Sequence, residues 1–131
     1  MKVVFLIARI LLGLIFTVFG LNGFLHFLPM AMPKGLAGQY FGVLFMSHYL
    51  VPIFAVQLIG GLMLLANRFV PLALTILGAV LVNILLFHIL MNPSGLPMAL
   101  FTTLLWFLTF YSVRRAFAGI FWMKVPTEEH L

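Results

Sequence analysis

The chain has 131 residues, of which 65% are hydrophobic and only 7% are charged, and its mean hydropathy is +1.27. A soluble domain of this size needs far more charge on its surface, so the composition excludes a water-soluble globular protein. The absence of cysteine excludes disulfides, thiolate metal sites and iron–sulfur clusters carried by this chain. The net charge of +5 does not indicate nucleic-acid binding, because the basic residues stand at the ends of apolar segments.

Four apolar segments approach or exceed the roughly 20 residues that a helix needs to cross a bilayer. They cover about residues 3–28, 49–66, 69–91 and 96–117. The sequence therefore predicts an all-α fold, an integral membrane four-helix bundle formed by residues 1–122. Residues 123–131 are predicted to be a cytoplasmic tail.

The segment between the first two spans, residues 29–48, is too short and too rich in glycine to cross the membrane. Gly35, Gly38 and Gly42 recur at helical spacing, which predicts a short interfacial helix at the outer surface. Two interpretations remain open for it, a lid over the mouth of the bundle and a simple connector with an apolar face.

The distribution of basic residues predicts the orientation. With four spans, one side of the membrane carries six of the seven Lys and Arg residues, namely Lys2, Arg9, Arg68, Arg114, Arg115 and Lys124. The other side carries only Lys34. Because positive residues stay on the cytoplasmic side, both termini are expected there, in the cytoplasmic (inner) membrane of a bacterium.

Polar side chains inside the predicted spans are costly and therefore informative. The set in the outer half of the bundle comprises Asn22, His26, Gln57, Asn83 and His88. One interpretation is that these residues only join helices by hydrogen bonds, and the other is that they line a ligand site. Asn22, Gln57 and Asn83 are expected to point into the bundle, because an amide in hydrocarbon loses its hydrogen bonds.

Small residues form a stripe on the first span, where Gly13, Thr17 and Gly20 share a face. Small residues let helices approach closely, which predicts packing inside the bundle or, alternatively, contact with a second protomer in a homo-oligomer. No Asp or Glu lies in any span, since the only acids are Glu128 and Glu129. A proton pump driven by carboxylates is therefore not expected.

Five stretches, residues 8–16, 20–27, 60–65, 68–74 and 83–88, have the apolar patterns of a known family. In them the chain resembles the DoxX family of small four-helix bacterial membrane proteins, over about residues 8–117. The resemblance implies a four-helix fold and an association with respiratory or sulfur redox chemistry, since some relatives are described as a membrane subunit of a thiosulfate:quinone oxidoreductase. Relatives often have Glu where this chain has Gln57. Because of this departure, a role that needs a carboxylate at this position is not expected.

The sequence thus favours a membrane subunit that binds a small lipophilic ligand, such as a quinone, in a polar pocket of the outer half. Its expected partners are the lipid bilayer and the other subunits of a redox enzyme. One alternative is a scaffold or assembly subunit without catalysis. Another is a haem protein in which His26 and His88 are the two axial ligands. The candidate cofactor-binding residues are His26, His88, Asn22, Gln57 and Asn83.

Overall fold

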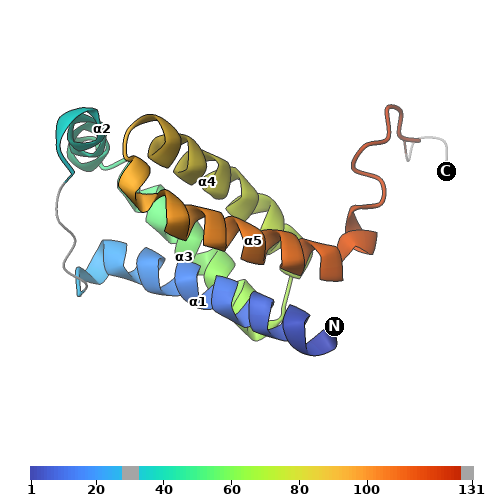
Figure 1. Cartoon of the computed structure of the whole chain (residues 1–131). Coiled ribbons are helices and arrows are strands. Elements are labelled where there is room, and N and C mark those ends of the chain that lie inside the picture. The colour runs from blue at the N-terminus through green and yellow to red at the C-terminus, as the bar shows by residue number, and fades with distance from the viewer. Residues whose placement is uncertain (28–32, 128–131) are drawn as a thin grey trace.

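The computed structural model describes residues 1–27 and 33–127, and in these residues it is all-helical (Figure 1). The α-helices are α1 (Lys2–Leu25), α2 (Gly35–Met46), α3 (Leu50–Ala66), α4 (Val70–Leu90) and α5 (Leu96–Ser112). Two 3-10 turns flank the last helix, η1 (Pro93–Gly95) before it and η2 (Arg114–Phe117) after it. The prediction of an all-α fold with a short helix between the first two spans is confirmed.

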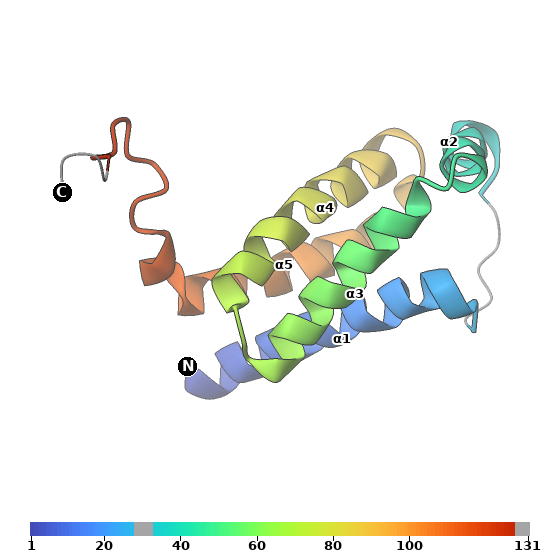
Figure 2. The ribbon, with the colours of Figure 1, turned by 180° about the vertical axis from the view of Figure 1, so that it is seen from behind.

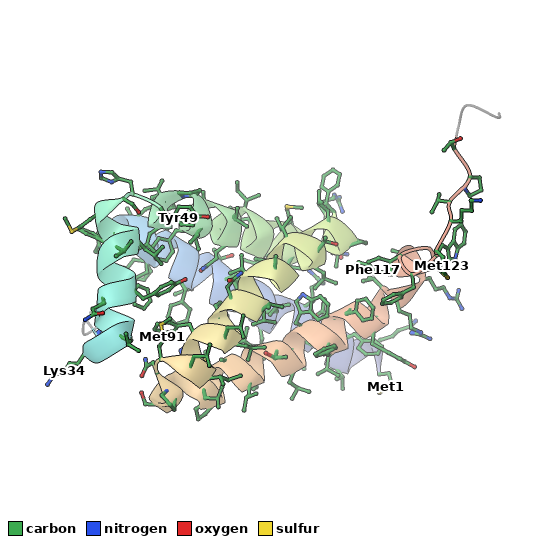
Figure 3. All side chains as sticks on the ribbon, turned by 90° about the horizontal axis from the view of Figure 1, so that it is seen from above. Met1, Lys34, Tyr49, Met91, Phe117 and Met123 are labelled. Carbon is green, nitrogen blue, oxygen red and sulfur yellow. The ribbon has the colours of Figure 1, made fainter. Side chains whose placement is uncertain are left out.

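Helices α1, α3, α4 and α5 pack side by side as a four-helix bundle (Figures 1 and 2). The main neighbours of α1 are α3 and α5, and these same two helices are the main neighbours of α4, so α1 and α4 lie on opposite sides of the bundle. The N-terminus, the α3–α4 turn and η2 lie together at one end, which we call the basic end. Helix α2 lies across the other end, which we call the α2 end (Figure 3).

Three segments are each long and apolar enough to cross a membrane, namely α1, α4 and the run Pro93–Ser112. Helix α3 has 17 residues and reaches the same length only together with α2, from which it is bent by 90°. Among the described residues, three helices are therefore long and apolar enough to cross a membrane, or up to four if the bent α2–α3 pair counts as one span. Helix α2 itself runs across the end of the bundle and not along the bundle axis (Figure 3).

The helix ends differ from the predicted spans in two places. Helix α1 ends at Leu25, because His26 turns the backbone into the left-handed region, and residue 28 of the predicted span lies outside the described residues. Helix α5 ends at Ser112, five residues before the predicted end at 117, and the chain continues as the tighter turn η2.

The bundle buries little of its own helix surface. In the most apolar stretch of each crossing segment, only 28%, 28% and 22% of the residues are buried, for α1, α4 and Pro93–Ser112 respectively. Large apolar side chains such as Ile7, Ile59, Val82 and Leu104 face outward from four different helices. A helix that is apolar on all sides yet buried on only one is typical of a protein whose surroundings are lipid.

Helices α1 and α3 pack with their backbones nearly touching. A Cβ atom on Gly20 would lie 2.7 Å from the backbone nitrogen of Leu58, and a Cβ atom on Gly61 would lie 2.6 Å from the backbone nitrogen of Thr17. Neither position has room for a side chain, so these glycines set the distance between the two helices. The small-residue stripe of α1 therefore packs inside the bundle, and a second protomer is not needed to explain it.

The apolar core lies in the half of the bundle nearer the basic end. Its fully buried large side chains are Phe16, Leu12, Leu64, Leu74 and Leu77. The half nearer the α2 end holds three buried polar side chains instead, those of Asn22, Gln57 and Thr102. Thr109, the fourth buried polar residue among those described, lies in the half nearer the basic end, so buried polar side chains are more numerous toward the α2 end but are not confined to it.

Candidate functional site

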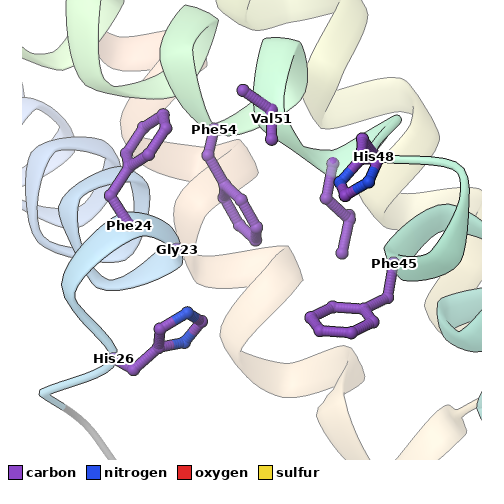
Figure 4. Close-up of a pocket in the computed structure, with 8 residues that line it drawn as sticks. Gly23, Phe24, His26, Phe45, His48, Val51 and Phe54 are labelled. Atoms are coloured by element: carbon purple, nitrogen blue, oxygen red, sulfur yellow. The ribbon is translucent and has the colours of Figure 1, made fainter.

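A pocket of about 190 Å³ lies at the α2 end, between the end of α1 and the start of α3 (Figure 4). Most of its lining is apolar, and the polar side chains in it are two histidines, His26 and His48. The remaining lining residues are Gly23, Phe24, Phe45, Leu50, Val51 and Phe54. Figure 4 shows the two imidazole rings on different sides of the space that Phe45 and Phe54 also border.

His26 reaches this pocket because it ends α1. Its backbone is in the left-handed region, with φ 53° and ψ 40°, and its N–H donates to the backbone oxygen of Asn22 at 2.8 Å. A left-handed residue stops a helix and turns the chain aside, and histidine tolerates this conformation better than most residues. The side chain of His26 is consequently exposed at the mouth rather than buried along the helix.

His48 has the same kind of backbone in the turn that joins α2 to α3, with φ 62°. Its N–H donates to the backbone oxygen of Phe45, and the N–H of Tyr49 donates to that of Leu44. Four non-glycine residues among those described have positive φ, and both that belong to the α2 end line this pocket. A left-handed residue after a helix is an ordinary way to end it, and here it explains how both histidines come to line the pocket.

The ring of Phe54 lines the pocket and packs closely on Gly23. A Cβ atom added to Gly23 would overlap the ring carbons of Phe54, so only glycine leaves room for the ring here. Gly23 therefore lets α3 place an aromatic ring across the end of α1. Gln57 follows on the next turn of α3 and does not line the pocket.

Asn22 and Gln57 are buried, with 7% and 8% of their surface exposed, so the prediction that they point into the bundle is confirmed. Gln57 makes no hydrogen bond within the described residues. Both residues belong to the turns just beneath the pocket, on α1 and α3, but neither one lines it.

Asn83 does not point into the bundle, so that prediction is wrong. Its side chain is exposed on α4, and its Nδ2 donates to the backbone oxygen of Ala79 at 2.9 Å. A bond to the preceding turn satisfies the amide without help from another helix, which removes the reason to expect it inside. Asn83 is therefore not part of the pocket.

His88 is half-buried at the α2 end of α4, in surroundings of its own. Its Nδ1 lies 2.8 Å from the backbone oxygen of Ile84, and its ring is packed so closely on Gly95 that a Cβ atom there would overlap it. His88 does not line the pocket that contains His26, and α1 and α4 are on opposite sides of the bundle. His26 and His48 therefore line the same open pocket, whereas His88 does not.

The hydroxyl groups of α5 serve the helix itself. Thr102, Thr103 and Thr109 each donate to the backbone oxygen four residues earlier, at 2.8–2.9 Å. The polar contact between helices in this region is the indole N–H of Trp106, which donates to the backbone oxygen of Leu74 at 3.0 Å. It acts in packing α5 on α4 and lies away from the pocket.

His48 is the residue that sequence reasoning missed, because it falls in a connector and not in a span. A detectable signal was present, since a histidine stood next to the predicted start of the second span, on the same side of the membrane as His26. Within the described residues, no three side chains of His, Cys, Asp or Glu gather as a metal site would require. Comparisons with protein-family models, curated protein sequences and solved structures find no match to this chain.

Proposed function

We propose that the chain is an integral protein of a bacterial cytoplasmic membrane, and that its pocket binds the head group of a small lipophilic carbonyl compound such as a quinone. The observation that carries this proposal is the pairing of His26 and His48 around one apolar pocket. An imidazole ring has an N–H donor in either protonation state, so each ring can donate a hydrogen bond to a carbonyl oxygen. A quinone offers two such oxygens on a flat apolar ring.

The size of the pocket restricts the ligand. At about 190 Å³ it is smaller than the roughly 300–1,000 Å³ of sites that enclose a whole drug-sized molecule. It suits one ring between Phe45 and Phe54, while a long apolar tail would lie outside, along the helices. Outward-facing side chains such as Phe24 and Val51 border the pocket and offer the tail an apolar surface.

The redox setting of the proposal rests on the resemblance of the sequence to the DoxX family, in which some relatives are described as a subunit of a quinone-reducing enzyme. The chain would then act as a membrane subunit that holds the quinone for a partner subunit. With two candidate hydrogen-bond donors and no carboxylate before residue 128, its own contribution would be to bind and orient the ligand.

The test is the quinone content of protein purified in lipid nanodiscs, measured by mass spectrometry of the solvent extract. The double variant His26→Ala/His48→Ala should retain little quinone, whereas His88→Ala, the matched control, should retain as much as the parent. Equal quinone in the double variant and the parent would refute the site. Quinone at the background level of empty nanodiscs in every preparation, with no binding of an added short-chain quinone, would favour the scaffold function instead.

A further inference from the structure

The basic end of the bundle gathers nearly all the positive charge of the chain. Lys2, Arg68, Arg114, Arg115 and Lys124 are exposed there, at the N-terminus, the α3–α4 turn and the segment after α5. Figure 3 places Met1, Phe117 and Met123 toward this end and Lys34, the remaining lysine, at the opposite one. The basic end is therefore strongly positive, whereas the α2 end is almost neutral.

These cations have no carboxylate partner within the described residues, because the first acidic residue of the sequence is Glu128. Their charge must be balanced from outside the part of the chain that the structure describes. At the end of a membrane-crossing bundle, the anions at the right height are the phosphates of lipid headgroups.

The segment after α5 combines this charge with unusual apolar exposure. It is anchored to the bundle by Val113 and Phe117, and the ring of Phe117 lies 4.9 Å from that of Phe110. Beyond this anchor the side chains of Phe121, Trp122 and Met123 are 92%, 61% and 103% exposed. Aromatic side chains placed between cations are typical of segments that lie at a membrane surface, where rings enter the headgroup boundary and charges stay in water.

Arg114 is held in position for such a contact. Its guanidinium lies 4.0 Å from the ring centre of Tyr111, and its Nη1 donates to the backbone oxygen of Tyr111 at 2.8 Å. A guanidinium has five N–H donors in one plane, so the bond to Tyr111 leaves others that can bind two oxygens of one phosphate. Arg115 stands next to it on the same exposed turn.

We propose that residues 113–125 form an anchor for anionic phospholipid, in which Arg114, Arg115 and Lys124 bind headgroup phosphates while Phe121, Trp122 and Met123 enter the headgroup boundary. The proposal rests on the membrane insertion proposed above but is independent of the quinone pocket at the other end. The partner is the anionic lipid of the leaflet that the basic end faces.

The chain allows a direct test, because it has two tryptophans and only Trp122 belongs to the anchor. The parent and a Trp122→Phe variant are reconstituted into vesicles with bromine-labelled acyl chains, and the difference in quenching reports on Trp122. This difference should be larger in vesicles that contain phosphatidylglycerol than in vesicles of phosphatidylcholine alone. Equal quenching of Trp122 in the two lipids would overturn the proposal.

A second measurement uses native mass spectrometry to count phosphatidylglycerol molecules bound to the full chain. Each basic residue near an anionic surface adds to the affinity, so the triple variant Arg114→Gln/Arg115→Gln/Lys124→Gln should bind this lipid on the order of a hundredfold more weakly. Lys34→Gln, which removes the lysine of the opposite end, is the matched control and should bind as the parent does. Unchanged binding by the triple variant would refute the anchor, and retention of quinone by the same protein would show that the pocket proposal is unaffected.

Discussion

Arg9 of α1 donates a hydrogen bond from Nη1 to the backbone oxygen of Leu64 in the last turn of α3. The side chain is half-buried, so this basic residue ties two helices together. The last carbonyl groups of a helix lack partners within it and carry partial negative charge, which makes them a favourable place for a cation. The same helices also meet at their glycines.

We expect Arg9→Gln to lower the free energy of unfolding by about 1–3 kcal/mol, because a hydrogen bond between a charged group and a half-buried carbonyl is lost. Lys2→Gln is the control, since it removes an exposed cation from the same end of α1 and should change stability by less than about 0.5 kcal/mol. Unfolding in detergent micelles, followed by circular dichroism, measures both. Equal effects of the two substitutions would mean that charge, and not the bond to Leu64, matters.

The glycines of the α1–α3 contact provide a second prediction. Gly20→Ala should destabilise the bundle by about 1–3 kcal/mol, because the new methyl group would meet the backbone of Leu58, which cannot move aside as a side chain can. Gly42→Ala in α2 is the control, since no atom lies within 4 Å of its added Cβ and alanine favours the helix by about 1 kcal/mol over glycine. The midpoint temperature of thermal unfolding should fall for Gly20→Ala and rise for Gly42→Ala. A Gly20→Ala protein as stable as the parent would contradict the close contact.

The orientation can be tested with single cysteines, because the natural chain has none. A cysteine in place of Lys34 should react with a membrane-impermeant maleimide added to intact spheroplasts. A cysteine in place of Lys124 should react only after the membrane is permeabilised, because the orientation predicted from six basic residues against one has that end in the cytoplasm. The reverse pattern would invert the orientation and put the pocket on the cytoplasmic side.

How far the sequence predicts this fold depends on the kind of signal. The helices and their order were predicted from the lengths of the apolar segments, and α2 was predicted from its glycine spacing. The direction in which the Asn83 side chain points could not be predicted. Helix α4 is apolar on almost every side, and a helix face turned to lipid is as apolar as one turned to the core. The exact end of α1 depended on the left-handed backbone of His26, which no pattern of hydrophobicity encodes.

The candidate site also combines features that the sequence predicts with features that only the packing of the helices shows. Burial of Asn22 and Gln57 was predicted from the cost of an unpaired amide in hydrocarbon. The pairing of His26 with His48 depends on the 90° bend between α2 and α3, a tertiary feature that brings a connector residue over the end of another helix. Residue depth along the spans could suggest His88 as a partner for His26, but only the packing of α4 opposite α1 excludes it from the pocket.

The last prediction concerns Gln57, whose side chain is 8% exposed and makes no hydrogen bond within the described residues. An amide that only joins helices is stabilising, whereas a buried amide without a partner costs about 1–3 kcal/mol. We therefore expect Gln57→Met, which keeps the length of the side chain without its polar atoms, to raise the stability of the ligand-free protein by about 1 kcal/mol. The gain should be the same when a short-chain quinone is added, because Gln57 does not line the pocket. Differential scanning calorimetry with and without the quinone measures both effects, and Thr103→Val, whose hydroxyl bonds its own helix, serves as the control. A large loss of stability in ligand-free Gln57→Met would contradict the prediction and would show that the amide stabilises the bundle.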